Sequence, residues 1–236
     1  TAWQNAFAAK IIEKCDRYLA ITGNSWMACL KNSPFWHWEP KIVHLDLAVN
    51  RDDFPLIKKN FNQVKKRRFL YIGHTGWYKN ITYLEKLAQK LPETEFAWMG
   101  GNQTLKNITT LGKYDFSSQE AKNLIQEYDF MITLGSADAN PTTILEAIAW
   151  GLIPVCSVQS GYAGFSSIRN ISIDSINDSL ETIKQLQSVP DEQLKKWQKV
   201  NLTELDKHFN WDRFCDQVLY EIENEKSPNL NETNLK

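Results

Sequence analysis

The 236-residue sequence has few cysteines, almost no excess charge and no long apolar run. Its four cysteines lie far apart and form no Cys-x-x-Cys pair, so a zinc site or a disulfide framework is not indicated and a reducing, cytoplasmic compartment is expected. A net charge of −1 offers no global attraction to nucleic acid or to an anionic membrane. No apolar stretch reaches the roughly eighteen residues of a membrane-spanning helix.

Two common nucleotide-binding fingerprints are also missing. The loop from Gly73 to Asn80 lies between a predicted strand and a predicted helix, where phosphates are often bound. It has the spacing of neither a Walker A loop nor the Gly-x-Gly-x-x-Gly dinucleotide fingerprint. An ATPase or a dehydrogenase is therefore disfavoured.

From residue 68 onward, short apolar runs alternate with helical patterns. The apolar runs predict strands at 69–73, 95–99, 108–111, 129–134 and 153–158. The helical spacing of apolar residues predicts helices at 80–91, 117–128 (opened by a capping box at Ser117), 141–150, 175–187, 191–208 and 211–224. This alternation indicates a parallel sheet with helices on both faces, so the predicted fold class is Rossmann-like, doubly wound α/β.

The N-terminal residues show a shorter series of the same kind. They predict a helix over 2–14, a strand over 17–22, a helix beginning at 24 or 25, and a strand over 41–49. The stretch from Asn50 to Arg68 is polar and basic, and we expect a linker, over 51–67, with a solvated surface rather than a binding patch. Its basic residues include Lys58, Lys59 and the cluster Lys65, Lys66, Arg67 and Arg68. Residues 225–236 lack apolar periodicity and predict a disordered tail.

A second loop, from Asp138 into the helix at 141–150, has the features of an anion site. Asn140 suits the N-cap and Pro141 the first helical position, which leaves the N–H groups of Thr142 and Thr143 unpaired. These donors and the positive end of the helix dipole suit a diphosphate. Lys79 is expected nearby, because loops that follow parallel strands gather at one edge of the sheet.

Glu146 lies among apolar residues of the same helix and needs a polar partner, for which ribose or sugar hydroxyls are candidates. Each residue also has a purely structural interpretation. Lys79 can open a helix, Asp138 can be a turn residue, and Glu146 can belong to a salt bridge. Most of the nine tryptophans are expected in packing, and Trp77 is the one placed in a candidate site loop.

Taken together, the motifs resemble the retaining GT-B glycosyltransferases of family GT4. The family has an acidic residue followed, after seven others, by a glutamate, and then a Gly-x-Pro-Val turn. Asp138, Pro141 and Glu146 match this pattern with Asp in place of Glu, and Gly151–Val155 matches with one inserted residue. The loop from Gly73 to Lys79 is similar to the family's Gly-Arg-x4-Lys loop, with His74 in place of arginine.

The resemblance implies a donor site for a nucleotide diphosphate sugar. The implied contacts are His74, Gly76, Lys79, Thr142 and Thr143 for the diphosphate, Glu146 for the ribose, Asp138, Ala139 and Asn140 for the sugar, and Lys113 and Tyr114 for the base. Lys79, Asp138 and Glu146 are the implied catalytic residues. The implied reaction transfers a hexose with retention of configuration, without a metal or another cofactor.

The resemblance also implies a division of the chain into parts of two domains. Residues 1–50 correspond to the end of the N-terminal acceptor domain, 51–67 to the linker, 68–208 to the nucleotide-sugar-binding domain, 209–224 to a helix that packs back on the first domain, and 225–236 to the tail. The chain begins at Thr1 without an initiator methionine, so we expect a fragment or a processed product. A glycan or lipid acceptor is then expected to bind the missing part, where peripheral membrane contact of the full-length protein is also compatible with the resemblance.

Two alternatives stay open: a GT-B nucleotide-sugar epimerase and a non-catalytic nucleotide-sugar-binding module.

Overall fold

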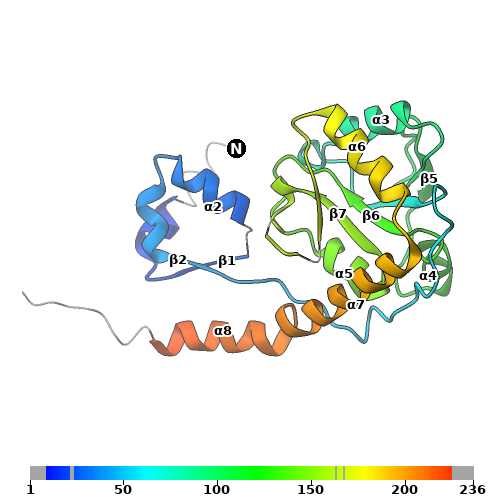
Figure 1. Cartoon of the computed structure of the whole chain (residues 1–236). Helices are drawn as coiled ribbons and strands as arrows, with labels where there is room; N and C mark the ends of the chain where they lie inside the picture. Colours follow the sequence, from blue (N-terminus) through cyan, green and yellow to red (C-terminus); the bar gives the residue numbers. More distant parts are fainter. Residues whose placement is uncertain (1–8, 22–23, 163, 167, 225–236) are drawn as a thin grey trace, which may run out of the picture.

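The computed structural model describes residues 9–21, 24–162, 164–166 and 168–224 and contains a two-stranded and a six-stranded sheet (Figure 1). The first part of the helix predicted over 2–14 and the predicted tail at 225–236 lie outside the described residues. Within the described part of the chain, no helix is both long enough and apolar enough to cross a membrane.

All neighbouring strands of the six-stranded sheet are parallel, in the order β5-β4-β3-β6-β7-β8. The strands are β3 (Arg68–Ile72), β4 (Glu95–Met99), β5 (Thr109–Gly112), β6 (Phe130–Thr133), β7 (Ile153–Ser157) and β8 (Arg169–Ile171). The predicted doubly wound α/β class is confirmed.

Helices cover both faces of this sheet (Figure 1). They are α3 (Ile81–Lys90), α4 (Gln119–Ile125), α5 (Thr142–Trp150), α6 (Ile176–Gln187) and α7 (Asp191–His208). On β3, Leu70 and Ile72 pack in a core with α4 and α5, whereas Phe69 and Tyr71 pack in a second core with α3 and α6. Because successive side chains of a strand point to opposite faces, a strand covered on both sides consists almost entirely of apolar residues.

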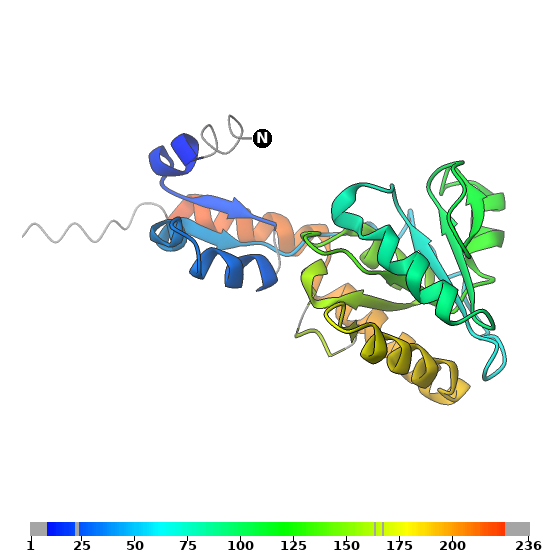
Figure 2. The same ribbon diagram turned by 90° about the horizontal axis from the view of Figure 1, so that it is seen from above.

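A smaller unit is formed by the N-terminal residues and the last helix (Figure 2). Its strands β1 (Tyr18–Ala20) and β2 (Ile42–His44) pair in parallel, and α2 (Asn24–Lys31) and the 3-10 helix η1 (Trp36–Lys41) connect them. Helix α8 (Trp211–Glu223) is joined to this unit by an ion pair of 2.8 Å between Arg213 and Asp46. The strand predicted over 41–49 is shorter than expected, because β1 offers only three residues for pairing.

The prediction that the basic residues of the linker are solvated is wrong for Lys58 and Arg67. Both are buried. Lys58 Nζ lies 3.0 Å from an oxygen of Asp129, and Arg67 Nη2 lies 2.6 Å from an oxygen of Asp191. A buried cation needs a counter-ion, and both partners are distant in sequence, so a local charge pattern does not reveal them.

Three local features also differ from the sequence predictions. Strand β8 was not predicted, because Arg169, Asn170 and Ile171 form too short a run, with two polar residues. The N-cap of α4 is Ser118, whose hydroxyl accepts from the N–H of Ala121, rather than Ser117. Ser117 instead turns back to hydrogen-bond the Asp115 carboxylate, and α4 ends at Ile125 instead of 128.

Candidate functional site

The strand order of the large sheet reverses between β3 and β6. From β3 the chain adds β4 and β5 on one side, and from β6 it adds β7 and β8 on the other. In open parallel sheets, ligands bind beyond the carboxyl ends of the strands at such a reversal. The loops singled out in the sequence follow β3 and β6, and the N–H of Ser136 in one donates to the carbonyl of Tyr78 in the other at 2.8 Å. Both predicted loops therefore lie together at the switch point.

Lys79 and Asp138 form a direct ion pair across these loops. The distance from Lys79 Nζ to Asp138 Oδ2 is 2.5 Å, and the side chains are only 12% and 9% exposed. Gly135 allows this approach, because a Cβ atom there would lie 2.7 Å from the Cβ of Asp138 and 3.3 Å from the Tyr78 carbonyl oxygen. The sequence placed the two residues in one site but did not predict that they neutralise each other.

Helix α5 begins at Thr142, and its N-cap is Pro141 rather than Asn140. Asn140 has a φ of 46°, in the left-handed region that asparagine tolerates better than most residues. Pro141 has no side-chain acceptor, so Thr142 and Thr143 begin the helix without a side-chain cap for their N–H groups. Thr142 is exposed and Thr143 partly exposed. The start of the helix therefore has no side-chain cap, which keeps the predicted anion site possible, although its N-cap is Pro141 and not Asn140.

The loop after β7 closes against this helix start. Gly161 has a φ of 93°, and a Cβ atom there would lie 2.1 Å from Asn140 Oδ1. That buried oxygen has no hydrogen-bond partner within the described residues. The buried Tyr162 hydroxyl donates to the carbonyl of Pro141 at 3.3 Å. Asn140 is therefore held by close packing in a position next to the predicted anion site.

Glu146 lies in the second turn of α5 and is partly buried. Burial raises the pKa of its carboxyl above the ordinary value. Within the described part of the chain no side chain forms a salt bridge with it, so the structure gives no support to its interpretation as a structural ion-pair residue. Burial raises the pKa of the nearby Tyr162, and Cys156, Asp46, Asp138 and Glu146 raise it further.

His74 is engaged within its own loop. The N–H of Gly76 donates to His74 Nδ1 at 2.9 Å, and the Tyr78 hydroxyl lies 2.8 Å from Nε2. With Nδ1 as an acceptor, the ring is the neutral tautomer with its proton on Nε2, and that proton is directed at Tyr78. The Tyr71 hydroxyl also donates to the His74 carbonyl at 2.6 Å. His74 and Gly76 thus shape the loop, and in this arrangement neither has a free donor for a phosphate.

The remaining predicted contacts are Trp77 and Ala139 in the two loops and Lys113 and Tyr114 after β5. Trp77 is 84% exposed in the short 3-10 helix η2 (Trp77–Lys79), and Ala139 is also exposed. Lys113 and Tyr114 follow β5, two strands away from β3. Lys113 is exposed, while Tyr114 packs partly against the core. Lys79, Asp138 and α5 come together through the loops after β3 and β6, whereas the residues predicted to contact the base follow the more distant strand β5.

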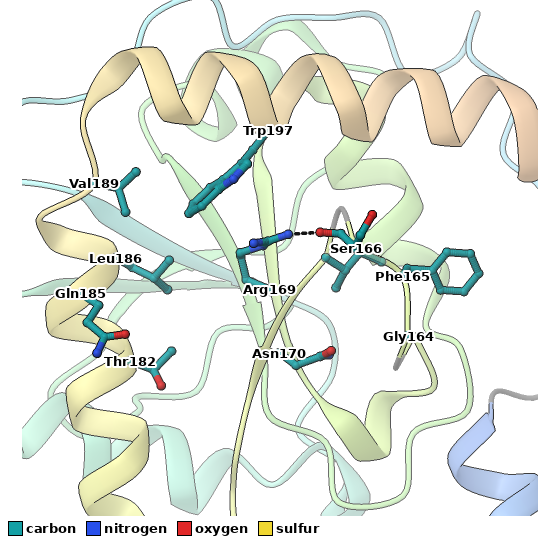
Figure 3. A pocket seen from close by; sticks show the side chains of 11 residues that line it. Gly164, Phe165, Ser166, Arg169, Asn170, Thr182, Gln185, Leu186, Val189 and Trp197 are labelled. Carbon is teal, nitrogen blue, oxygen red and sulfur yellow. Dashed lines mark hydrogen bonds between the residues drawn. The ribbon is translucent and has the colours of Figure 1, made fainter.

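A separate hollow of about 640 Å³ lies between β8, α6 and α7 (Figure 3). The Arg169 guanidinium is 4.6 Å from the centre of the Trp197 ring there, and Thr182 and Gln185 of α6 line the other side. None of the predicted site residues lines this hollow. We place the functional site at the switch point instead, because the charged pair and the helix N-terminus meet there. In the described residues, no three His, Cys, Asp or Glu side chains are grouped so as to hold a metal ion.

Comparison with known proteins shows similarity at the level of structure. No protein-family model and no curated protein matches the sequence. Sucrose-phosphate synthase from Thermosynechococcus elongatus matches with a TM-score of 0.72 at 14% identity over 92% of this chain and 61% of that chain. A glycosyltransferase from Rickettsia africae matches with a TM-score of 0.67 at 15% identity over 90% of this chain and 64% of that chain.

TarM matches with a TM-score of 0.66 at 16% identity over 90% of this chain and 45% of that chain. The chain therefore spans less than two thirds of each of these three proteins, at 61%, 64% and 45% of their lengths. Identities this low establish the fold alone. The chain has the Rossmann-like α/β architecture found in GT-B glycosyltransferases.

Proposed function

We propose that this chain binds a nucleotide diphosphate sugar at the β3–β6 switch point and is the donor-binding part of a retaining, GT4-like glycosyltransferase. The observation that carries the proposal is the meeting of Lys79, Asp138 and the uncapped start of α5 at the edge where open parallel sheets bind ligands. A structure of a TarM variant from S. aureus contains UDP, which supports a nucleoside diphosphate as the ligand class.

In this proposal, the N–H groups of Thr142 and Thr143 and the ammonium of Lys79 bind the diphosphate. As the bond to the sugar breaks, negative charge grows on the leaving diphosphate, and the cation and the helix dipole stabilise it in place of a metal ion. Glu146 binds the ribose, and Asp138, Ala139 and Asn140 contact the hexose. Lys113 and Tyr114 contact the base. His74 and Gly76 act by shaping the loop that presents Lys79.

The sugar acceptor binds outside the donor site in this proposal. We propose a glycan or lipid acceptor bound between residues 68–208 and a second Rossmann-like domain, of which residues 1–50 are the end. Two observations support this arrangement. The parallel β1–β2 pair with its connecting helix has the β-α-β arrangement on which Rossmann-like units are built, and this chain covers only 61% and 64% of two structural neighbours.

Titration calorimetry with UDP, GDP and uridine tests the donor site. We expect the 236-residue chain to bind UDP or GDP and to transfer no sugar from the corresponding nucleotide sugar. Lys79→Ala should weaken binding of the diphosphate roughly tenfold to a hundredfold, as for a lost charge-assisted hydrogen bond, and should barely change binding of uridine. Lys59→Ala, at an exposed lysine of the linker, is the matched control and should have no effect.

Two results would count against the proposal. Absence of affinity for every nucleoside diphosphate up to millimolar concentration would remove the donor site. Equal losses of uridine and UDP binding in Lys79→Ala would show that Lys79 does not contact the diphosphate. Product analysis with radiolabelled donor, incubated with the chain, then separates sugar transfer from epimerisation and from binding alone.

A further inference from the structure

The ion pair between Lys79 and Asp138 affects how an anion can bind to Lys79. Both side chains are about nine-tenths buried, and the oxygen and nitrogen are 2.5 Å apart. Within the described residues, neither side chain has another ion-pair partner. A buried ion pair is costly to break by removal of one partner, because the other charge is left without compensation. An incoming anion therefore meets a neutral pair rather than a free ammonium.

We propose that Asp138 is an internal counter-ion that a nucleoside diphosphate must displace from Lys79. This inference rests on the proposed donor site. It assigns to Asp138 a role in the binding equilibrium in addition to its contact with the sugar. Lys79 Nζ then exchanges one negatively charged oxygen for another, the carboxylate for a phosphate.

Exchange of this kind distinguishes an intact donor from the spent nucleoside diphosphate. Once displaced, the Asp138 carboxylate loses its cation and needs new hydrogen bonds, because it lies in a loop that buries it. Sugar hydroxyls of an intact donor can donate those hydrogen bonds. The spent diphosphate has no sugar, so the carboxylate regains a partner only by pairing with Lys79 again. Asp138 should therefore favour release of the product.

The surroundings of Asp138 are suited to an exchange between two partners. Gly135 lies against its Cβ, and Asn140 follows with a left-handed φ of 46°, so the loop has a defined path on both sides of the carboxylate. Ala139, between Asp138 and Asn140, is exposed. In the proposal, the Asp138 carboxylate turns away from Lys79 while this part of the loop keeps its path.

The test compares UDP and GDP binding by calorimetry in the wild-type chain, Asp138→Asn, Lys79→Met and the double variant. Asp138→Asn keeps the size of the side chain but removes the competing charge, so we expect UDP or GDP to bind roughly tenfold more tightly, the factor of about one charge-assisted hydrogen bond. In the Lys79→Met background, the same change should give a clearly smaller gain, because only the direct repulsion between the carboxylate and the diphosphate is then removed. The gain should also be smaller for an intact nucleotide sugar than for the diphosphate.

Asp206→Asn is the matched control, since Asp206 pairs with Arg51 at 3.0 Å on the exposed surface, and it should leave affinity unchanged. Thermal unfolding shows whether each variant is folded, and Asp138→Ser replaces Asp138→Asn if the latter is not. Unchanged or weaker diphosphate binding in a folded Asp138 variant, beside measurable binding by the wild type, overturns the inference and leaves the donor site intact. If none of the variants binds UDP or GDP, the proposed function fails and the inference with it. If only the Asp138 variants bind, the counter-ion role is supported.

Discussion

Glu146 is a carboxyl group whose environment favours its protonated form. Burial raises its pKa in the folded chain above the ordinary value of 4.5. A carboxyl group whose pKa is higher in the folded than in the unfolded chain stabilises the fold while it is protonated. This contribution to the free energy of unfolding is complete below the unfolded-state pKa, and it is lost as the pH rises through the folded-state pKa. At neutral pH, the ionised side chain therefore reduces the stability of the fold. Such a cost is typical of residues kept for binding rather than for stability.

We predict that Glu146→Gln raises the free energy of unfolding at pH 7.5 by about 1 kcal/mol or less, the size of an ordinary point substitution, while it weakens binding of UDP and of uridine alike. The stability gain should shrink toward zero near pH 4, where wild-type Glu146 is protonated as well. Urea unfolding at the two pH values measures this difference. Glu120→Gln, at an exposed position of α4, should show no such pH-dependent gain. A less stable Glu146→Gln at neutral pH would mean that the ionised carboxylate has a stabilising partner.

The buried carboxylate of Asp129, just before β6, links several elements of the large unit. Asp129 pairs with Lys58 and also accepts hydrogen bonds from the N–H groups of Asn62 and Arg68, at 2.8 and 3.0 Å. This single carboxylate joins residues 58–62 and the beginning of β3 to the strand that forms the other side of the switch point. The linker is therefore part of the folded unit along this stretch.

We predict unequal effects from the two halves of this pair. Asp129→Asn leaves Lys58 buried without a counter-ion and should lower the free energy of unfolding by about 3–5 kcal/mol. Lys58→Met should cost less, because Asp129 keeps its N–H donors and the methionine chain can pack in the same space. Guanidinium unfolding measures both, with the exposed Lys59→Met as a control within about 0.5 kcal/mol of the wild type. If Lys58→Met proves the more damaging, the N–H donors are not what stabilises Asp129.

Most helices and strands could be predicted from the sequence, whereas features that depend on contacts with residues far away in the sequence could not. The bounds of β4 and α7 agree with the predictions, because both have strong periodicity and clear ends. β8, the buried Lys58 and Arg67, and the Asn140 backbone depend instead on contacts with residues far along the chain. The candidate site shows the same division. Its loops and residue types were predictable from the order of strands, whereas the Lys79–Asp138 pair and the engagement of His74 required the side-chain positions.

Among the residues that the structure describes, helix α8 has an apolar surface that no other element covers. None of the residues of α8 is buried, and Leu219, Tyr220 and Ile222 are 54%, 63% and 58% exposed. An apolar surface of this kind favours association. We predict that the isolated chain self-associates as its concentration rises, and that the double variant Leu219→Glu/Ile222→Glu associates less while its melting temperature is unchanged. Sedimentation velocity over a concentration series measures the association.

The matched control for this helix is a pair of charge changes at exposed polar positions, Asp212→Asn and Asp216→Asn, which alter the charge of α8 but not its apolar side chains. These changes should leave self-association in place. Loss of thermal stability in the Leu219→Glu/Ile222→Glu chain would instead show that α8 stabilises the chain through those side chains.

The position of the site at a reversal of strand order also governs when the site can form during folding. The half-sheet β3-β4-β5 carries Lys79, and the half-sheet β6-β7-β8 carries Asp138 and α5. They meet through the pairing of β3 with β6, where the rings of Phe69 and Phe130 stack at 4.8 Å across a long separation in sequence. Contacts of such long range close large loops and form slowly. A chain in which only one half has folded thus has no complete site, and the rate at which ligand-binding competence appears after refolding should report the docking of the two halves.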